Sequence, residues 1–445
     1  MWSGALCAPE IKGFCFDARQ VRPGDCFVAL RGSARDGHEF IEQANQGGAV
    51  AALVEVISDA ELPQLLVADT LLALGQIGAQ VRQAFSPPVV GVTGSSGKTS
   101  TKEMLRILLG GDGLVHATAG NWNNRIGVPM TLLQLDAQRQ DFAVIEAGIN
   151  QPGEMELLGA MIRGDLTVVT NIGPAHLELL GNLEGVASEK ARLAQTAVEQ
   201  SPIILPREVL DFGAFAVLAQ RAIVLIESGQ NCELNVRNAV SYRLQATGGG
   251  TTVLELGAGP EVQQYTIASP SQGIARNAGL AILAARELGI AEAAIKARIE
   301  AWRPVGSRGR VETRGAQRFY IDCYNANPAS MRDALQAFRS MLAPELPRIY
   351  VLGAMNELGA QAAHWHASVA AGLQLRPIDR VYFIGPQALT RAYAAGALQG
   401  GAQPDQIQRM ENHGNLKSEI AEMAGALFFK GSRAYALEQL LPFPL

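Results

Sequence analysis

The stretch that most constrains this chain is Gly91-Val-Thr-Gly-Ser-Ser-Gly97-Lys98-Thr99, which follows the apolar residues Val89 and Val90 and leads into a helical pattern. A strand, a glycine turn and a helix in this order gather backbone N–H groups and a positive helix end around one point, which suits a phosphate. The residues expected around that phosphate are Gly94, Ser95, Ser96, Gly97, Lys98, Thr99 and Ser100. Lys98 would reach the outer phosphates, and the Thr99 hydroxyl would ligate their Mg²⁺.

This loop departs from the usual phosphate-loop pattern at one position. The pattern G-x-x-x-x-G-K-[ST] needs a glycine where Val92 stands, and the glycines lie instead at 91 and 94. The sequence therefore predicts a variant phosphate loop, with an ordinary glycine turn between a strand and a helix as the alternative.

Length and composition limit the classes of protein to which the chain can belong. With 445 residues it is too long for one core and is expected to form about three domains. A net charge of -5 gives no basic footprint for nucleic acid or for an anionic membrane surface. Five cysteines without C-x-x-C spacing argue against a disulfide framework or a structural zinc site. We expect a soluble, cytoplasmic protein, monomeric, with no nucleic-acid partner and no membrane insertion.

The order of apolar runs predicts an α/β protein of three domains. Residues 1–86 look like a small N-terminal α/β domain, with residues 81–88 as a linker. Residues 87–305 alternate apolar runs with helical patterns, which predicts a central parallel sheet of the P-loop ATPase type, ending in an antiparallel hairpin between 234 and 267 and a helix from Asn277 to Leu288. Residues 306–445 predict a Rossmann-like C-terminal domain, whose first helix is capped by Asn327 and started by Pro328.

Polar residues follow the apolar runs of the central domain, where a parallel sheet collects its ligands. Glu146 ends one run, and Asn171-Ile-Gly-Pro-Ala-His176 follows the next. Together with the glycine loop, this favours metal ligation by Glu146 and His176, although either residue alone is more often solvated or packed. Taken by itself, Lys190 would be a surface lysine of a helix.

Seven motifs in order resemble those of the Mur ligase family. They are Ser95-Ser-Gly-Lys-Thr-Ser-Thr-Lys-Glu103, Thr118-Ala-Gly-Asn-Trp-Asn-Asn-Arg-Ile-Gly-Val-Pro129, Ile145-Glu-Ala-Gly148, Asn171 to His176, Asp322-Cys-Tyr-Asn-Ala-Asn-Pro328, Leu352-Gly-Ala-Met-Asn-Glu-Leu-Gly359 and Lys430-Gly-Ser-Arg433. The match spans all three predicted domains. The asparagine-rich run and the Tyr-Asn-Ala-Asn-Pro and Lys-Gly-Ser-Arg motifs are most similar to the members that add a dipeptide.

The resemblance implies an ATP-dependent ligase that phosphorylates the terminal carboxylate of UDP-N-acetylmuramoyl-tripeptide and joins it to D-alanyl-D-alanine, with ATP and Mg²⁺ as cofactors. It implies catalytic roles for Lys98, Glu146, His176 and Lys190, and metal ligation by Thr99, Glu146, His176 and a carbamylated Lys190. Nucleotide contacts would come from the loop with Asn277, Arg310 and Asp322. Substrate contacts would come from Asp17, Arg19, Gly37, His38, Thr118, Asn121, Asn123, Asn124, Asn325 and Asn327.

Several positions depart from the family pattern. Gly273 and Ile274 stand where the family usually has a His-Asn pair, Ala354 replaces an aspartate, Arg192 a glutamate and Ala18 a serine. Two other hypotheses compete with the dipeptide ligase. One is a ligase of the same architecture that adds a single amino acid or glutamate. The other is a nucleotide-binding partner protein that has lost catalysis.

Overall fold

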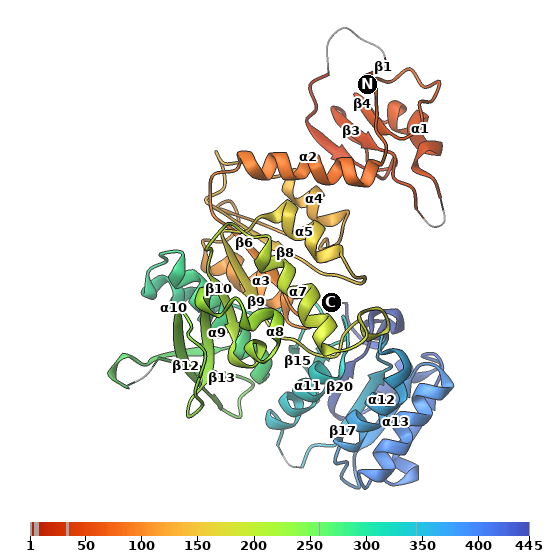
Figure 1. Cartoon of the computed structure of the whole chain (residues 1–445). Helices are drawn as coiled ribbons and strands as arrows, with labels where there is room; N and C mark the ends of the chain where they lie inside the picture. The colour runs from red at the N-terminus through yellow and green to blue at the C-terminus, as the bar shows by residue number, and fades with distance from the viewer. Residues whose placement is uncertain (1, 4–8, 33–34, 258, 344, 445) are drawn as a thin grey trace.

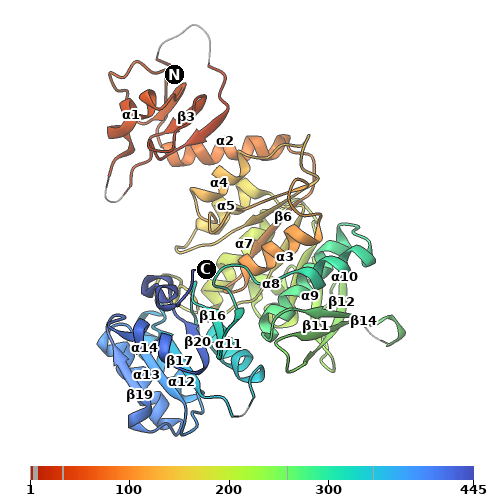
Figure 2. The same cartoon turned by 180° about the vertical axis from the view of Figure 1, so that it is seen from behind.

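The computed structural model describes residues 2–3, 9–257, 259–343 and 345–444, apart from residues 33 and 34, and it contains three β-sheets that follow one another along the chain. Figures 1 and 2 show the three α/β domains in succession, with the N-terminal domain standing off one end of the central domain. The α/β fold class with a parallel-rich central sheet is confirmed. The boundaries at residues 86 and 305 stay a prediction. Cys15, Cys26, Cys232 and Cys323 are free thiols, and Cys7 lies outside the described residues.

The N-terminal domain is built on a five-stranded sheet in the order β1-β5-β4-β3-β2. Its elements are β1 (Trp2–Ser3), β2 (Gly13–Cys15), β3 (Asp25–Val28), α1 (Ile41–Gln46), β4 (Ala51–Val54) and β5 (Gln64–Leu66). β2 to β5 are parallel, and β1 pairs antiparallel with β5. The apolar run Ala51–Val54 is buried along its whole length, as a strand covered on both faces requires.

The central domain holds a nine-stranded sheet in the order β14-β13-β12-β11-β10-β9-β6-β8-β7. Its strands are β6 (Val89–Thr93), β7 (Val115–Ala117), β8 (Phe142–Glu146), β9 (Leu166–Val169), β10 (Ile203–Pro206), β11 (Ala222–Glu227), β12 (Asn238–Ala246), β13 (Thr252–Leu256) and β14 (Gln263–Ile267). Its helices are α3 (Lys98–Leu108), α4 (Gly127–Leu132), α5 (Glu154–Ile162), α6 (Leu177–Leu180), α7 (Leu183–Gln195), α8 (Gly213–Ala216), α9 (Gln272–Glu287) and α10 (Glu292–Ala301).

This central sheet is buried on both faces. Val90 and Val92 of β6 pack into the core that contains α3, α9 and α10, whereas Val89 packs into the core on the other face with α5. The antiparallel hairpin predicted between residues 234 and 267 is confirmed as β12 and β13, with β14 added beside it. The helix predicted from Asn277 begins earlier, at Gln272, because Ser271 caps it by accepting a hydrogen bond from the backbone N–H of Ile274.

The C-terminal domain has a six-stranded sheet in the order β15-β16-β20-β17-β18-β19. Its elements are β15 (Arg310–Arg314), β16 (Gln317–Asp322), α11 (Pro328–Ser340), β17 (Arg348–Gly353), α12 (Ala362–Ala371), β18 (Arg380–Ile384), α13 (Gln387–Gln399), β19 (Ile407–Met410), α14 (Leu416–Glu422) and β20 (Gly425–Lys430). The predicted start of α11 is confirmed: the Asn327 side chain caps it with Ser330 in a capping box, and Pro328 is its first residue.

A helix that the sequence analysis missed joins the first two domains. Helix α2 (Thr70–Ala84) includes residues 81–84 of the predicted linker and lies against α4 and α5 of the central domain (Figure 1). A Cβ at Gly78 would come within 3.0 Å of Pro129 Cα, so glycine permits this close approach. The linker prediction was wrong for residues 81–84, because tertiary packing rather than the Pro-Pro signal decides where the helix ends.

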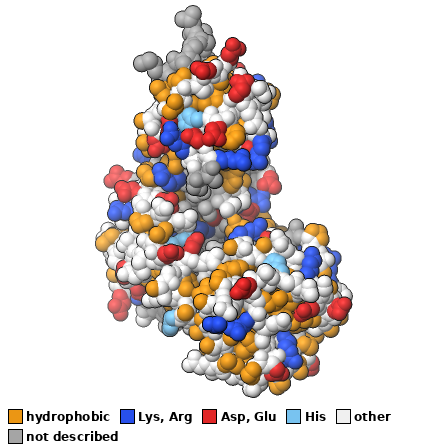
Figure 3. Space-filling view, turned by 90° about the vertical axis from the view of Figure 1, so that its right-hand side faces the viewer, with side chains coloured by type: hydrophobic (Ala, Val, Ile, Leu, Met, Phe, Trp, Pro, Cys, Tyr) orange, Lys and Arg blue, Asp and Glu red, His pale blue; other side chains and the backbone are white. Residues whose placement is uncertain are grey.

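The surface and the helix lengths add two observations. On the face shown in Figure 3, lysine and arginine side chains are interspersed with acidic ones over all three domains. Among the described residues, no helix has the length and apolar character needed to cross a membrane.

The side chain of Arg82 forms most of the hydrogen bonds between α2 and the central domain. Its guanidinium donates to the backbone carbonyl oxygens of Ile162, Phe85 and Arg163 at 2.9 to 3.0 Å, and to Asp165 Oδ2 at 2.8 Å. Burial lowers the pKa of Arg82, whereas the Asp165 charge opposes that shift.

We predict that Arg82→Met lowers the free energy of unfolding by about 1–3 kcal/mol, because it leaves three carbonyl groups without this donor, whereas the half-exposed Asp165 keeps the hydrogen bond from the Val89 backbone N–H. Chemical denaturation monitored by circular dichroism measures the effect. The exposed neighbour Gln83, changed to alanine, is the control and should leave stability within about 0.5 kcal/mol of the wild type. Equal stability of Arg82→Met and the control would contradict the prediction.

Candidate active site

The glycine loop between β6 and α3 is the centre of the candidate site. Gly94 has φ +149° and Gly97 has φ +79°, backbone conformations that side chains rarely adopt. A Cβ at Gly94 would lie 1.8 Å from Thr170 Oγ1, and one at Gly97 would lie 2.1 Å from Asn277 Nδ2. Both glycines are therefore needed for conformation and for space, and Gly97 caps the helix that begins at Lys98.

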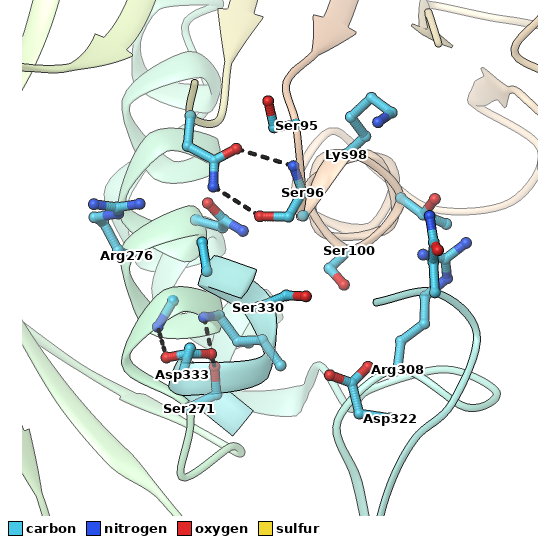
Figure 4. Close-up of a pocket in the computed structure, with 18 of the residues that line it drawn as sticks. Ser95, Ser96, Lys98, Ser100, Ser271, Arg276, Arg308, Asp322, Ser330 and Asp333 are labelled. Carbon is cyan, nitrogen blue, oxygen red and sulfur yellow. Dashed lines mark hydrogen bonds between the residues drawn. The ribbon is translucent and has the colours of Figure 1, made fainter. Parts of the chain in front are cut away.

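The segment that follows β9 holds this loop in place. Asn171 Oδ1 accepts a hydrogen bond from the Ser96 backbone N–H at 2.9 Å, and Asn171 Nδ2 donates to Ser96 Oγ at 2.7 Å (Figure 4). Ser95 Oγ donates to the Gly173 carbonyl at 3.0 Å and accepts from the Gly173 N–H at 2.9 Å. The loop is thus fixed by a neighbouring strand end as well as by its own turn.

Three ionisable side chains lie next to the loop, of which Lys190 and Glu146 are buried and Lys98 is partly exposed. Lys98 Nζ donates to the Gly94 carbonyl at 2.8 Å, and burial lowers the pKa of Lys98. Lys190 on α7 is fully buried, and burial together with the Lys98 charge lowers its pKa well below the usual value. Glu146, at the end of β8, is 1% exposed. Its Oε1 accepts from Asn123 Nδ2 at 2.6 Å, whereas Glu146 Oε2 and Lys190 Nζ have no partner among the described residues.

The loop forms one wall of a cavity of about 520 Å³ between the central and C-terminal domains. The central domain contributes residues from the loop, from β8, from the asparagine-rich run and from the start of α9. The C-terminal domain contributes the segment from Asp322 to Asp333, with Lys430. The predicted residues that line it are Ser95, Ser96, Gly97, Lys98, Thr99, Ser100, Asn121, Asn123, Glu146, Asn277, Asp322, Asn325 and Asn327.

On the C-terminal side, Asp322 accepts a hydrogen bond from Lys430 Nζ at 2.5 Å, and Lys430 also donates to the Asn325 carbonyl at 3.1 Å. Asn327 Nδ2 donates to the Ser95 carbonyl of the loop at 3.4 Å. Residues from two domains and from distant parts of the sequence therefore meet around one space.

Some predicted residues lie outside this cavity lining. His176 is not among its residues, and its Nδ1 lies 2.6 Å from Glu357 Oε2 of the C-terminal domain. Arg310 lies on β15 and pairs with Glu312 at 3.0 Å. Thr118 Oγ1 accepts from the Glu146 backbone N–H at 2.9 Å, and Asn124 Oδ1 accepts from the Gly127 N–H at the start of α4. These last two side chains hold the local backbone.

The four predicted residues of the N-terminal domain also lie outside the cavity lining. Asp17 and Arg19 form a two-bonded pair at 2.7 and 2.9 Å, and hydrogen bonding from Arg19 lowers the pKa of Asp17 to about 2. His38 Nδ1 lies 2.6 Å from Asp36 Oδ1, and His38 Nε2 accepts from the Glu55 backbone N–H. A Cβ at Gly37 would lie 2.6 Å from the Leu30 carbonyl oxygen.

Several cavity residues were not predicted. The guanidinium of Arg308 lies 3.7 Å from the centre of the Tyr324 ring and forms no ion pair with a described carboxylate. Figure 4 shows Arg308 on the same side of the pocket as Asp322. Asp333 receives hydrogen bonds from Ser271 and Gly273 of the central domain. Arg308 lies two residues before the arginine that the motif pointed to. Asp333 lies on a helix whose sequence pattern gave no functional signal.

The donors beside the loop fit a hydrated divalent cation. Mg²⁺ is usually held by one or two carboxylates together with substrate phosphates and water, so it needs no closed protein cage. Glu146 Oε2 is a buried acceptor without a protein partner, and Thr99 lies at the start of α3 in the same cavity. Among the described residues, no three His, Cys, Asp or Glu side chains gather closely enough to hold a metal by themselves.

Comparison with known proteins gives consistent matches along the whole chain. Family profiles match at residues 10–94 (Mur ligase family, catalytic domain), 92–285 (Mur ligase middle domain) and 309–433 (Mur ligase, glutamate ligase domain). The chain is 34% identical to the UDP-N-acetylmuramoyl-tripeptide--D-alanyl-D-alanine ligase of Escherichia coli, over 96% of this chain and 92% of that protein. It is 31% identical to the enzyme of the same name from Bacillus subtilis, over 99% and 96%. The crystal structure of MurF from Acinetobacter baumannii superposes with a TM-score of 0.83 at 29% identity, over 97% of this chain and 92% of that one.

The matched pair Gly97 and Gly111 tests the loop. Both have φ +79°, but only at Gly97 would an added Cβ meet another group, the Asn277 amide. Both alanine variants should lose about 1 kcal/mol of stability from the left-handed conformation. We predict that Gly97→Ala additionally weakens ADP binding about tenfold or more in isothermal titration calorimetry, since the displaced amide enters the cavity, whereas Gly111→Ala binds as the wild type does. Equal ADP affinity in both variants would refute the role of the loop.

The buried Lys190 side chain is expected to lower the free energy of unfolding, because an amine without a partner loses its hydration on burial. We predict that Lys190→Met raises the free energy of unfolding by about 1–3 kcal/mol in bicarbonate-free buffer without nucleotide. Thermal and denaturant unfolding measure this change, and the exposed Lys296, changed to methionine, serves as the control. A destabilised Lys190→Met variant would mean that the amine has a stabilising partner in solution.

Proposed function

The chain belongs to the Mur ligase family, and we propose from this premise that it is an ATP-dependent ligase joining D-alanyl-D-alanine to UDP-N-acetylmuramoyl-tripeptide. The main support for an ATP-dependent reaction is the cavity, in which the phosphate loop of one domain faces Asp322, Asn325 and Lys430 of another. The choice of substrates is supported by relatives of that name, which align with nearly the full length of the chain. Such an enzyme catalyses a step of peptidoglycan precursor synthesis.

The reaction proceeds in two transfers. An oxygen of the terminal carboxylate of the peptide attacks the γ-phosphorus of ATP, the bond to the bridging oxygen breaks, and ADP leaves. The amine of D-alanyl-D-alanine then attacks the acyl carbon of the acyl phosphate. Inorganic phosphate leaves with the electrons of the broken C–O bond, and the amine loses a proton as the amide forms.

The residues of this chain would bind and orient the reactants. The N–H groups of the loop and the N-terminal end of α3 suit the phosphates, with Lys98 placed to neutralise the transferred group. Asn277, Arg310 and Asp322 are the proposed nucleotide contacts, and Arg308, which the cavity includes, is a further cation on that wall. Asn325 and Asn327 would face the incoming dipeptide.

Mg²⁺ would be held by Thr99, Glu146 and Lys190, the last as a carbamate, and His176 would join them only once its ring is released from Glu357. Carbamylation adds CO₂ to a neutral amine and turns a cation into an anion, and the lowered pKa of Lys190 favours the neutral amine that this needs. When bound, the metal supplies charge neutralisation at the outer phosphates. The unpaired Glu146 Oε2 supports this assignment.

The N-terminal domain, proposed as residues 1–86, would hold the UDP end of the muramoyl peptide through Asp17, Arg19, Gly37 and His38. Thr118, Asn121, Asn123 and Asn124 would position the sugar and peptide, either directly or by holding the backbone of the asparagine-rich run. Residues 87–305 and 306–445 would be the ATP-binding and Rossmann-like domains. We propose a cytoplasmic monomer that acts on small molecules.

A coupled assay for ADP release tests the proposal. With ATP, Mg²⁺ and UDP-N-acetylmuramoyl-tripeptide, release should require D-alanyl-D-alanine, and the product should gain the mass of the dipeptide less water. Release that needs glutamate or another single amino acid would favour the alternative ligase. No release with any amine would favour a binding protein without catalysis.

Lys98→Ala should lower kcat about 10²–10³-fold or more, because it removes a cation from the phosphate site. Circular dichroism should show an unchanged fold. The exposed Lys296→Ala variant is the control and should keep full activity. A fully active Lys98→Ala enzyme would contradict the assigned role of the loop.

A further inference from the structure

Helix α11 of the C-terminal domain contacts the central domain at two points. At its start, Asn327 Nδ2 donates to the Ser95 carbonyl of the phosphate loop. Six residues further on, Asp333 contacts the start of α9. Six residues span about 9 Å of helix, so the two contacts grip the central domain at separate places and fix an orientation as well as a distance.

The contact at Asp333 is a carboxylate placed on a helix N-terminus of another domain. Ser271 Oγ donates to Asp333 Oδ2 at 2.6 Å, and the Gly273 backbone N–H donates to Asp333 Oδ1 at 2.8 Å (Figure 4). Ser271 is the N-cap of the 16-residue helix α9. Both carboxylate oxygens are therefore used, and a negative charge sits at the positive end of the helix.

Gly273 makes room for this contact. A Cβ there would lie 3.0 to 3.2 Å from the carboxyl atoms of Asp333, tighter than ordinary van der Waals contact. Burial raises the pKa of Asp333, the hydrogen bonds from Ser271 and Gly273 lower it, and the nearby charges of Asp322 and Lys430 act in opposite directions. The contacts thus offset part of the cost of burying the carboxylate.

The two elements that this contact joins both lead to the reaction centre. Helix α9 packs against α3, the helix that begins at Lys98, and its Asn277 lies against Gly97. On the other side, α11 follows directly from the segment Asp322 to Asn327 that lines the cavity. Its opposite face, including Met331 and Leu335, is part of the core of the C-terminal domain. A shift of α11 on α9 therefore moves Asp322 and Asn325 relative to the loop.

We propose that Asp333 is a positioning residue, whose carboxylate ties α11 to the N-terminus of α9 and so sets the place of the C-terminal wall over the phosphate loop. It touches no reacting atom and acts through the two helices. The kinetic part of this inference rests on the proposed ligase function, whereas the structural part does not.

Small-angle X-ray scattering of the full chain with saturating AMP-PNP and Mg²⁺ tests the structural part. The wild type and Asp333→Asn should have the same radius of gyration, because the amide oxygen still accepts from the Gly273 N–H and the Ser271 hydroxyl can rotate. Asp333→Ala should be measurably more extended. Gln336→Ala, an exposed position on the same helix, is the control and should match the wild type.

Kinetics test the positioning role. Asp333→Ala should lower kcat about ten- to a hundredfold, as misplacement of reacting groups by about 1 Å does, with the KM for the UDP-linked peptide within about twofold. Asp333→Asn should restore most of kcat. Adding Ser271→Ala to Asp333→Ala should extend the chain no further, because both changes break the same contact.

Equal radii of gyration for the wild type and Asp333→Ala, or failure of Asp333→Asn to restore either measurement, would overturn the proposal. The scattering does not depend on turnover, so the contact can be supported even if the ADP-release assay rejects the ligase reaction. If Asp333→Ala does not fold, the comparison of Asp333→Asn with Ser271→Ala decides. The hydroxyl donor is lost only in Ser271→Ala, so that variant alone should be extended.

Discussion

The constraint on which the site depends is the burial of charge beside a loop made of glycine and small residues. Lys190 and Glu146 are buried and Lys98 is partly so, and the described residues leave Lys190 Nζ and Glu146 Oε2 without partners. Such groups cost the fold free energy unless a ligand completes them. A triphosphate and its cation offer charges that complement those of the lysines and of Glu146. The free energy lost by burying these side chains is therefore offset when the reactants bind and are oriented.

A loop of this kind cannot hold its own shape. Gly94 and Gly97 give it conformations that other residues avoid, but they contribute no side chains to fix it. The structure supplies the restraint from the next strand end, where Asn171 and Gly173 bond to both serines of the loop. Preorganisation here results from pairing neighbouring parallel strands, since that pairing brings residues 94–97 and 170–173 together.

The sequence predicts features whose cause is local. The strand, glycine turn and helix around residues 89–108, the Asn327 cap and the buried strands follow from residue order and apolar runs, and the structure contains them. Features fixed by distant partners could not be predicted. In the sequence, Arg82 has the pattern of a surface residue, and its burial depends on the packing of α2 on the central domain. The role of Asp333 depends on its contact with Gly273, which is 60 residues away in the sequence.

The metal site shows a further limit of motif spacing. Position along the chain put His176 with Glu146, because both follow strands of one sheet. In the structure the His176 residue has φ +55° and its ring pairs with Glu357 of another domain. Spacing can identify which strand end a side chain follows. It cannot give the direction of the side chain once the backbone turns away from the strand.

The two domain junctions differ in physical character, and this difference assigns them different roles. The first is made by a buried arginine with four hydrogen bonds and by glycines that let α2 pack closely, and breaking it would expose unpaired groups at high cost. The second includes the Asp333 contact, the Asn327 bond and the His176 pair. Hydrogen bonds to charged groups contribute about 1.5–3 kcal/mol each and neutral ones about 1 kcal/mol. Helix α2 is therefore tied to the central domain through one buried side chain, whereas the C-terminal wall of the cavity is held by several separate polar contacts.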